Sequence, residues 1–381
     1  MSTELFDLFS RALAVAKVPG TLRKIVPLVP EASTRRYYRL HLSDEKTTVG
    51  FSPSMAPPTQ VPPCTMVGVH EDTTTAATNM PNVLAVQHFL RERGVAVPEI
   101  FFSDPATGVM LQQDLGDLSL NQALKENPDK VDLLYQDAIL HMFNWQRLAD
   151  DGQCPAFRLS FDVEKLMFEF DFFIDHTLRG YYKTTAPDAE LKEIRRAFLK
   201  IAEKLAAPAN KIFTHRDYHS RNIMLVGSEP FDSAQGPPPH YRQFIIDFQD
   251  ARLGLMQYDL CSLLCDAYAP LSLERRAGLL DFAFEQGKEI HRQTRAEFDH
   301  YWQLSAFQRT VKAMGTFGRQ AALGRDDFAA YLNPAWQMLR EISEGDVVLQ
   351  KLETDLSALC KVKPRRHGEH GAEEEPTRIE A

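Results

Sequence analysis

The sequence lacks three features that would each assign it to a distinct class of protein. No stretch approaches the roughly 20 consecutive apolar residues that a membrane-spanning helix needs. The N-terminal residues include acids and no apolar run long enough for a signal peptide. The net charge of −9 provides no overall positive field that would attract nucleic acid. We therefore expect a cytoplasmic protein with neither a membrane nor a nucleic acid as its partner.

Cysteine is also scarce, and its spacing excludes two common uses. The five cysteines are scattered at Cys64, Cys154, Cys261, Cys265 and Cys360, and no two of them form a C-x-x-C pair. The odd number and the absence of paired spacing argue against a disulfide framework and favour a reducing compartment. Cys261 and Cys265 would share one face of a helix, where core packing is their expected role.

What the sequence does contain indicates a globular α+β protein. Hydrophobic residues make up 44% of the 381 positions and charged residues 25%, which suits a sizeable core. Strand patterns dominate residues 1–113 and helical patterns dominate residues 114–360, so we expect a small β-rich lobe followed by a larger, mainly helical lobe. Residues 361–381 are dense in charge and nearly free of apolar side chains, which predicts a disordered tail.

Two short runs carry the chemistry. His215-Arg-Asp-Tyr-His-Ser-Arg-Asn222 places an aspartate and an asparagine five positions apart, and Ile245-Ile-Asp-Phe248 ends an apolar strand with an aspartate. Phosphoryl transfer needs a carboxylate beside the attacking hydroxyl and oxygen ligands that hold Mg²⁺ on the phosphates. This pattern predicts Asp217 as the catalytic carboxylate, and Asn222 and Asp247 as the metal ligands.

The same residues also allow two simpler interpretations, a zinc site and a helix cap. His215 and His219 are four apart, as in a zinc site on a helix, but no glutamate of the H-E-x-x-H pattern lies between them and no third ligand follows. Asp247 alone could cap a helix after a strand. The apolar strands expected at residues 222–226 and 244–246 favour phosphotransferase chemistry, because they place both motifs at strand ends.

The remaining elements are expected from local patterns. Tyr37–Leu42 alternates as a strand, with Thr47–Phe51 as its partner, and Asn82–Arg93 is expected to be a helix. The connection from residue 227 to residue 242 is rich in proline and glycine and exceeds the usual length of a hairpin loop. It is either a lid over the site or a tolerated insertion.

Together these motifs resemble a known family, the aminoglycoside phosphotransferase and choline kinase branch of the protein-kinase-like fold. The resemblance rests on Gln113-Asp-Leu-Gly116, on the two runs above and on Tyr258-Asp-Leu260, in the same order over about residues 30–340. Within this branch, residues 32–39 and 308–317 look similar to bacterial N-acetylmuramate/N-acetylglucosamine anomeric kinases. The resemblance implies a bilobal fold, ATP and Mg²⁺ as cofactors, and a sugar or aminoalcohol as the small-molecule partner; it indicates no oligomeric state.

The resemblance also implies roles for further residues. The phosphate-covering loop would use Ser33, Thr34 and Arg36, and the hinge that meets adenine would be Gln112, Gln113, Asp114 and Leu115. His215 and Asp259 would brace the catalytic loop by hydrogen bonds. Arg221, Asp250 and Asp266 are candidate substrate contacts, although helix caps and ion pairs would explain them equally well.

Three departures from the family pattern affect the nucleotide site. The phosphate-covering loop, Glu31–Arg36, has no glycine and cannot approach phosphates as closely as a glycine-rich loop does. No lysine is present in the expected strand, where Thr48-Val-Gly-Phe51 stands instead, and Gln249 replaces the glycine after Asp-Phe. Arg36 or Arg39 could supply the missing charge, or could brace the core.

Three functions follow from these expectations. The first is an ATP-dependent kinase for the anomeric hydroxyl of N-acetylmuramate or N-acetylglucosamine, which serves cell-wall recycling. The second is an aminoglycoside or choline/aminoalcohol kinase, whose cationic substrate would need an acidic pocket. The third is a nucleotide-binding scaffold without turnover.

Overall fold

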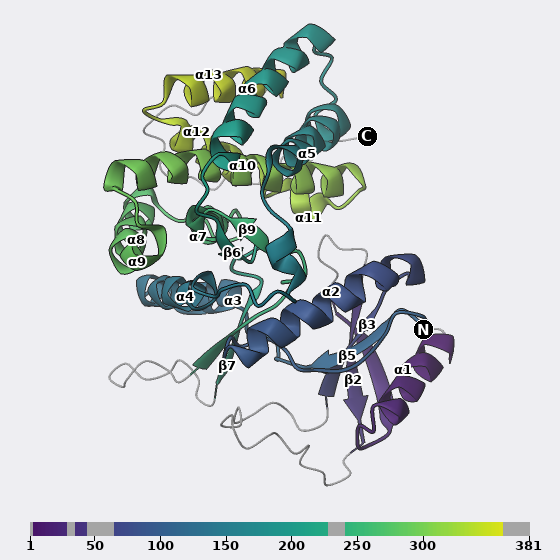
Figure 1. Ribbon diagram of the computed structural model, residues 1–381. Coiled ribbons are helices and arrows are strands. Elements are labelled where there is room, and N and C mark those ends of the chain that lie inside the picture. The colour runs from purple at the N-terminus through teal and green to yellow at the C-terminus, as the bar shows by residue number, and fades with distance from the viewer. Residues whose placement is uncertain (1–2, 29–34, 44–64, 228–240, 361–381) are drawn as a thin grey trace.

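The computed structural model describes residues 3–28, 35–43, 65–227 and 241–360. They form a sheet-bearing part and a larger, mainly helical part (Figure 1). The first part is built on one antiparallel sheet of five strands in the order β1-β2-β3-β5-β4. Its strands are β1 (Leu22–Pro27), β2 (Arg36–Leu42), β3 (Thr65–His70), β4 (Ile100–Asp104) and β5 (Val109–Gln113).

Two helices cover the opposite faces of this sheet, α1 (Thr3–Val15) and α2 (Thr73–Glu92). Successive side chains of a strand point to opposite faces, and β3 shows the result. Met66 packs in the cluster that contains residues of α1, whereas Val67 packs in the cluster that contains residues of α2. Both faces of the central strand are therefore buried, and the sheet is held between the two helices.

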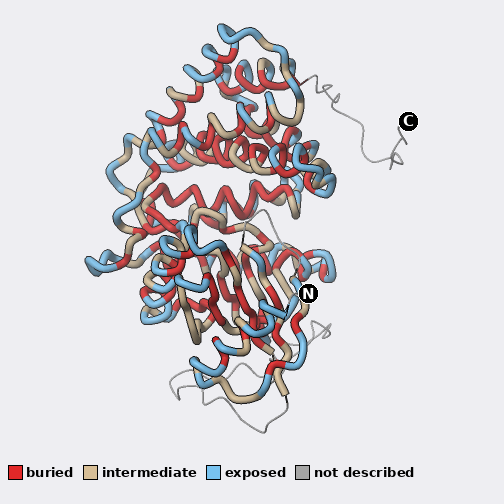
Figure 2. The backbone as a smooth tube through the Cα atoms, turned by 90° about the vertical axis from the view of Figure 1, so that its right-hand side faces the viewer, coloured by how far each residue is buried: buried red, intermediate tan, exposed pale blue. Residues whose placement is uncertain are grey.

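The helical part is arranged around α10 (Arg295–Ala322), the long helix that crosses it in Figure 1. Most of the circumference of this helix is buried, because it packs against several of the others. Figure 2 shows the buried residues of the chain in red, and they lie mainly in the interior of the molecule. The other helices of this part are α3 (Leu120–Glu126), α4 (Val131–Gln146), the short 3₁₀ segment η1 (Pro155–Arg158), α5 (Val163–Phe173), the π-helical η2 (Ile174–Tyr181), α6 (Asp188–Ala206), α7 (Met256–Leu264), α8 (Leu273–Gln286), α9 (Lys288–His291), α11 (Asp326–Ala329), α12 (Leu332–Ser343) and α13 (Val347–Leu359).

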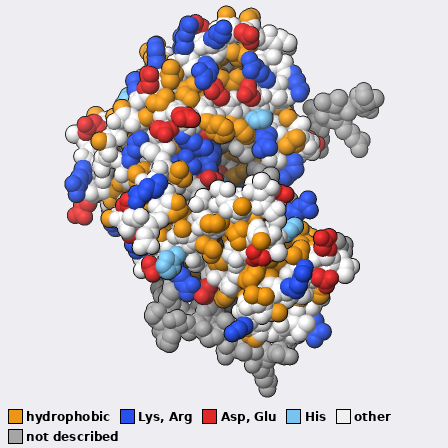
Figure 3. Space-filling model, turned by 45° about the vertical axis from the view of Figure 1, so that its right-hand side comes forward, with side chains coloured by type: hydrophobic (Ala, Val, Ile, Leu, Met, Phe, Trp, Pro, Cys, Tyr) orange, Lys and Arg blue, Asp and Glu red, His pale blue; other side chains and the backbone are white. Residues whose placement is uncertain are grey.

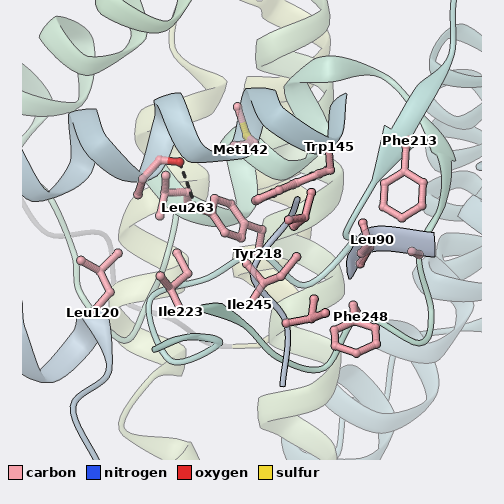
Figure 4. Packing of buried hydrophobic residues seen from close by; sticks show 14 of the residues in the cluster. Leu90, Leu120, Met142, Trp145, Phe213, Tyr218, Ile223, Ile245, Phe248 and Leu263 are labelled. Carbon is pink, nitrogen blue, oxygen red and sulfur yellow. Dashed lines mark hydrogen bonds between the residues drawn. The ribbon is translucent and has the colours of Figure 1, made fainter. Parts of the chain in front are cut away.

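Two antiparallel strand pairs connect these parts and carry the motif residues. The first pair is β6 (Ile212–Thr214) with β9 (Arg252–Gly254), and the second is β7 (Ile223–Gly227) with β8 (Tyr241–Ile245). Their apolar side chains enter a core that also contains residues of α2, α4 and α7 (Figure 4). The strand pairs are thus fixed to helices of both parts.

The α+β architecture expected from the sequence is confirmed, with strands up to Gln113 and mainly helices after it. The predicted start of the second helix is wrong: the helix begins at Thr73 instead of Asn82. Its first two turns are polar and Pro81 lies inside it, so no apolar periodicity marks this part. Asp72 starts the helix, because its side chain accepts a hydrogen bond of 2.9 Å from the backbone N–H of Thr74.

The predicted pairing of β2 also needs correction. Its observed neighbours are β1 and β3, neither of which was expected, while Thr47–Phe51 lies outside the described residues. The sequence pattern that would predict β3 is interrupted by Gly68, and glycine is depleted in strands. The connection at residues 228–240 and the tail at 361–381 also fall outside the described residues.

Within the described part of the chain, no helix is long and apolar enough to cross a membrane. Cys154, Cys261, Cys265 and Cys360 are buried free thiols, so the core-packing role expected for Cys261 and Cys265 is confirmed.

We predict that Gly68→Ala destabilises the fold by about 1–3 kcal/mol. A Cβ at this position would meet two ring atoms of Phe9, at 2.5 and 2.8 Å. That ring is fully buried and packs edge-on against Tyr38, so it has no room to move aside. The measurement is the urea midpoint or melting temperature of the variant.

The matched control is Gly278→Ala in α8, where a Cβ would meet no atom within 4 Å. This variant should be neutral or slightly stabilising, because alanine is the better helix former. Equal behaviour of the two variants would contradict the close packing of α1 on the sheet.

Candidate active site

The motif from His215 to Asn222 forms a loop between β6 and β7 that is anchored in the core. Tyr218 is fully buried, and its hydroxyl donates a hydrogen bond of 2.9 Å to the carbonyl of Ala138 in α4 (Figure 4). Its ring also packs edge-on against Trp145, with centroids 4.7 Å apart. One aromatic side chain therefore fixes the middle of the loop to a helix of the core.

Asp259 of α7 fixes the start of the same loop. Its buried carboxylate accepts hydrogen bonds from the backbone N–H groups of His215 (2.7 Å) and Arg216 (2.9 Å), and from the indole N–H of Trp145 (3.1 Å). Arg216 has a φ of 82°, in the left-handed region that side chains other than glycine rarely adopt. The carboxylate stabilises this conformation, which directs the following residue, Asp217.

His215 joins the loop to the second motif. Its Nε2 donates to the carbonyl of Ile246 over 3.0 Å, and its Nδ1 accepts from the backbone N–H of Asp217 over 3.3 Å. The backbone N–H of Ile246 in turn donates to the carbonyl of Asn222 over 3.1 Å. These bonds bring the two motifs side by side, although 25 residues separate Asn222 from Asp247 in the sequence.

Asn222 and Asp247, the two predicted metal ligands, place an amide and a carboxylate at neighbouring strand ends. The Nδ2 of Asn222 donates to the carbonyl of Asp217 over 2.9 Å, which orients the amide, and Gln249 donates to Asp247 Oδ1 over 2.8 Å. A carboxylate and an amide suit Mg²⁺, which takes few protein ligands and completes its shell with water and phosphates. Across the described ranges, no group of three or more His, Cys, Asp or Glu side chains could hold a metal ion, so the histidine-based zinc site has no support.

Asp217 lies among three cations. Lys312 of α10 donates a hydrogen bond to its Oδ1, Arg309 Nη2 lies 3.5 Å from the same oxygen, and Arg216 Nη1 lies 3.9 Å from Oδ2. Burial alone would raise the pKa of Asp217, but the positive charges of Lys312, Arg216 and Arg309 hold that pKa well below its usual range. The carboxylate is therefore ionised and directed toward positive neighbours.

For Lys312, the effect of burial on the pKa is larger than the effect of its oppositely charged neighbour. Its burial lowers the pKa of the ammonium to about 8, because desolvation and the neighbouring charges of Arg309 and Arg216 outweigh the attraction of Asp217. Lys312 is therefore the one cation of this group whose charge would change near neutral pH.

The cations are held in turn by a buried network. Arg216 contacts Glu169 of α5 over 3.2 Å and Asp250 over 2.9 Å. Glu169 is also bound by Gln308 over 2.9 Å. Lysine and arginine side chains gather on the helical side of the hollow between the two parts (Figure 3). The three cations beside Asp217 are thus balanced by the carboxylates of Asp217, Glu169 and Asp250.

Sequence reasoning missed Arg309 and Lys312. The only signal is their spacing of three residues within a helix that is otherwise largely apolar on its buried side, which places both on one face. Two basic residues on the buried face of a long helix require an anionic partner. The sequence alone does not identify Asp217 as that partner, because 92 and 95 residues separate it from the two cations.

The three candidate substrate contacts differ in their surroundings. Asp266 is buried and accepts three hydrogen bonds, from the backbone N–H and hydroxyl of Ser220 and from the N–H of Tyr268. Its observed role is to brace the loop. Asp250 is half exposed and paired with Arg216, whereas Arg221 lies against Tyr268, with its guanidinium carbon 3.7 Å from the ring centroid.

The predicted hinge positions contribute to the join between the parts. Arg39 of β2 forms a bidentate pair with Asp114, at 2.7 and 3.1 Å, and also contacts Asp117 over 2.9 Å. Burial would raise the pKa of Asp114, but Arg39 lowers it below the usual value. This pairing favours the bracing role among the two roles expected for Arg39.

The other hinge residues differ in how they are used. Gln113 accepts a hydrogen bond from the backbone N–H of Glu99 over 3.3 Å. Leu115 is buried with Val226 and Phe244, and Gln112 pairs with Val67 in the sheet. The side chains of these hinge residues thus hold the two parts together. The hinge backbone is then the group that remains for contact with an adenine base.

Arg35, which is not among the site residues expected from the sequence, is a further cation next to the sheet. It contacts Glu71, which precedes α2, over 3.3 Å, and Asn79 of α2 donates to the same carboxylate over 3.2 Å. The strand between β2 and α2 is β3, Thr65–His70, and it contains no lysine either. Arg36 is exposed at the start of β2, and Ser33 and Thr34 lie outside the described residues.

Arg35 is also electrostatically coupled to the catalytic side of the cleft. Burial would lower the pKa of its guanidinium, but Tyr37, followed by the carboxylates of Asp247 and Glu71, raises that pKa overall. A cation from the sheet-bearing part thus faces a proposed metal ligand from the other part.

Comparisons with known proteins agree with this geometry. A family model described as the phosphotransferase enzyme family matches residues 65–298. The N-acetylmuramate/N-acetylglucosamine kinase of Pseudomonas putida is 28% identical over 370 residues, which cover 94% of this chain and 96% of the relative. The kinase of the same name from Caulobacter vibrioides is 27% identical over 353 residues, 88% of this chain and 92% of the relative.

Solved structures show the fold. The ADP-bound aminoglycoside phosphotransferase APH(2'')-Ib is similar with a TM-score of 0.54 and 12% identity, over 90% of this chain and 99% of that one. An ethanolamine kinase of Plasmodium vivax has a TM-score of 0.53 and 11% identity, over 94% and 89%. The bilobal kinase-like fold expected from the sequence is confirmed. Since the family model covers more than half of its length, the chain belongs to the phosphotransferase enzyme family.

Proposed function

We propose that this protein is an ATP-dependent kinase for the anomeric hydroxyl of N-acetylmuramate or N-acetylglucosamine, and that it serves cell-wall recycling. The observation that carries the proposal is the setting of Asp217, an ionised carboxylate beside two oxygen ligands and surrounded by cations. Two relatives that bear the name of this activity align with most of the chain.

The local charge favours a neutral or anionic acceptor over a cationic one. Arg216, Arg309 and Lys312 all lie within 4 Å of Asp217, and of these Arg216 is also paired with Glu169 and Asp250. An aminoglycoside or choline would bring further positive charge into this setting, whereas such substrates need an acidic pocket. A sugar without positive charge is therefore the better acceptor.

In the proposed reaction, the sugar hydroxyl donates a hydrogen bond to Asp217 and its oxygen attacks the terminal phosphorus of ATP. The bond between that phosphorus and ADP breaks, and the proton passes to Asp217. A carboxylate of low pKa is a weak base, so Asp217 acts mainly by orienting the hydroxyl and accepts the proton late. Lys312 and Arg309 would then stabilise negative charge on the transferring group.

We assign nucleotide binding to residues up to 113 and the catalytic and acceptor sites to residues 114–360. Asn222 and Asp247 would hold Mg²⁺, which neutralises charge on the ATP phosphates when bound. The backbone from Gln112 to Leu115 would meet the adenine, with the partly buried Met224 and Ile246 as an apolar floor. Arg35 would contact the phosphates in place of the missing lysine.

Asp217→Asn should lower kcat by roughly 10²- to 10⁴-fold, because the hydroxyl loses the group that orients it and accepts its proton. ATP affinity should stay within a few-fold of the wild type. The assay is ADP release with N-acetylmuramate, N-acetylglucosamine, choline and kanamycin as acceptors.

The control for this variant is Asp188→Asn, whose side chain is 85% exposed on α6. It should retain full activity on every accepted substrate. Transfer to choline or kanamycin alone, or full activity of Asp217→Asn, would contradict the proposal. Binding of ATP without transfer to any acceptor would indicate a scaffold.

The pKa of Lys312 predicts that activity decreases at alkaline pH. Its ammonium form is the one that stabilises negative charge, and its pKa of about 8 means that this form is lost as the pH rises above that value. The logarithm of kcat/KM for the wild type should therefore fall above about pH 8. Lys312→Met should lose about 10²-fold in kcat at neutral pH.

Lys312→Arg provides the matched control, because arginine keeps its charge to about pH 12. This variant should retain part of the activity and show no fall near pH 8. The same fall in Lys312→Arg would assign the titration to another group.

Arg35→Met should raise KM for ATP by about 10- to 100-fold, since a hydrogen-bonded charge pair with phosphate is lost. The matched control is Arg36→Met, which removes the exposed arginine next to it. Arg36→Met should change KM for ATP by less than three-fold, as is usual for a single exposed charge. A larger effect of Arg36→Met than of Arg35→Met would return the phosphate contact to Arg36.

A further inference from the structure

Arg221 is held as an isolated, oriented cation in the catalytic loop. Its guanidinium carbon lies 3.7 Å from the centroid of the Tyr268 ring, and its Nη2 donates a hydrogen bond of 2.6 Å to the hydroxyl of Tyr331. Among the residues that the structure describes, no carboxylate pairs with it. By contrast, Arg216 and Arg309 in the same site are both paired with acids.

The two tyrosines form a rigid support for this guanidinium. Their rings pack edge-on against each other at 4.7 Å, and both contact Phe317 of α10, at 5.6 and 5.5 Å. Asn121 donates to the carbonyl of Tyr268 over 3.0 Å, which fixes the backbone there as well. The orientation of the guanidinium is therefore set before any ligand binds, which reduces the entropy lost on binding.

The aromatic support of Arg221 is connected to the catalytic residues. Its neighbour Tyr268 contacts the ring of His219 at 5.3 Å, and His219 approaches Asn222 within 3.4 Å. Helix α10 connects the two regions, since Lys312 contacts Asp217 and Phe317 supports the tyrosines. Five residues of an α-helix span about 7.5 Å, comparable to one sugar ring with its substituents.

A planar guanidinium that is stacked on an aromatic ring and still has free N–H groups is suited to bind a carboxylate with two parallel hydrogen bonds. The nucleotide phosphates belong at Asn222, Asp247 and Arg35, on the side of the sheet-bearing part. The side chain of Arg221 instead extends to Tyr331, at the start of α12 in the helical part. A neutral sugar would leave this half-buried cation in contact with water, at little cost.

We propose that Arg221, on the support of Tyr268 and Tyr331, binds the carboxylate of an acidic amino sugar while the anomeric hydroxyl faces Asp217. The assignment rests on the sugar-kinase function proposed above and identifies the group that distinguishes N-acetylmuramate, which carries a lactyl carboxylate, from the neutral N-acetylglucosamine. Arg221 is thus a specificity-determining residue, and the tyrosines are positioning residues.

The test compares the full-length wild type with Arg221→Gln on both sugars. The variant should lose about 10- to 100-fold more in kcat/KM for N-acetylmuramate than for N-acetylglucosamine, as expected for loss of hydrogen bonds to a charged group. The additional loss should appear in KM and not in kcat. Melting temperature and ATP affinity report any general damage to the loop.

Two further variants separate recognition from structure. Arg221→Lys keeps the charge but not the planar pair, so it should recover part of the selectivity. Tyr331→Phe removes only the hydroxyl that holds the guanidinium, and should cause a smaller loss of the same selectivity. Equal losses on both sugars in Arg221→Gln would overturn the assignment alone. Phosphorylation of neither sugar by the wild type would overturn the proposed function, and the assignment with it.

Discussion

The structure depends on keeping one largely buried carboxylate charged. The side chain of Asp217 is only 20% exposed, and its partial removal from water would favour the neutral form. Lys312 and Arg309 of α10, with Arg216 of the loop, reverse that preference. Because each of these cations is itself largely withdrawn from solvent, each requires further partners, and the packing of the central helices is tied to the charge of one side chain.

The partners form a second layer around the loop. Glu169 of α5 binds Arg216, and Asp259 of α7 holds the backbone of His215 and Arg216. These acids leave little surface to solvent and accept several hydrogen bonds each, as buried carboxylates must. These hydrogen bonds and ion pairs hold the loop in place although it has no regular secondary structure and contains Arg216 at positive φ.

The two faces of the cleft differ in the charges they present. On the side of the sheet, Arg35 is paired with Glu71 and lies in the field of Asp247. On the side of the helices, the cations around Asp217 are followed by Arg221 on its aromatic support. Cations gathered around one carboxylate in a chain of net charge −9 show that the overall charge says little about the charges that folding brings together at a site.

Much of the catalytic geometry could be predicted from local sequence. Asp217 and Asn222 are close in the chain, and the apolar strand before Asp247 indicated where the second motif begins. The helix at Thr73 and the strand at Thr65 were less evident, because a polar first turn and a mid-strand glycine weaken the periodicity. Asp266 was a candidate substrate contact because it is acidic and close to the motifs in the sequence. It is buried in the structure, and nothing in the neighbouring sequence indicates this.

The sequence by itself determined the chemistry of the catalytic loop, the α+β class and the order of its parts, since these follow from short motifs and from the periodicity of apolar residues. Only the tertiary structure decided which cations surround Asp217, which arginine faces Asp247 and which arginine is left without an acidic partner among the described residues. Those pairings join positions as many as 95 residues apart. They depend on how whole helices and strands pack, and no local pattern encodes that arrangement.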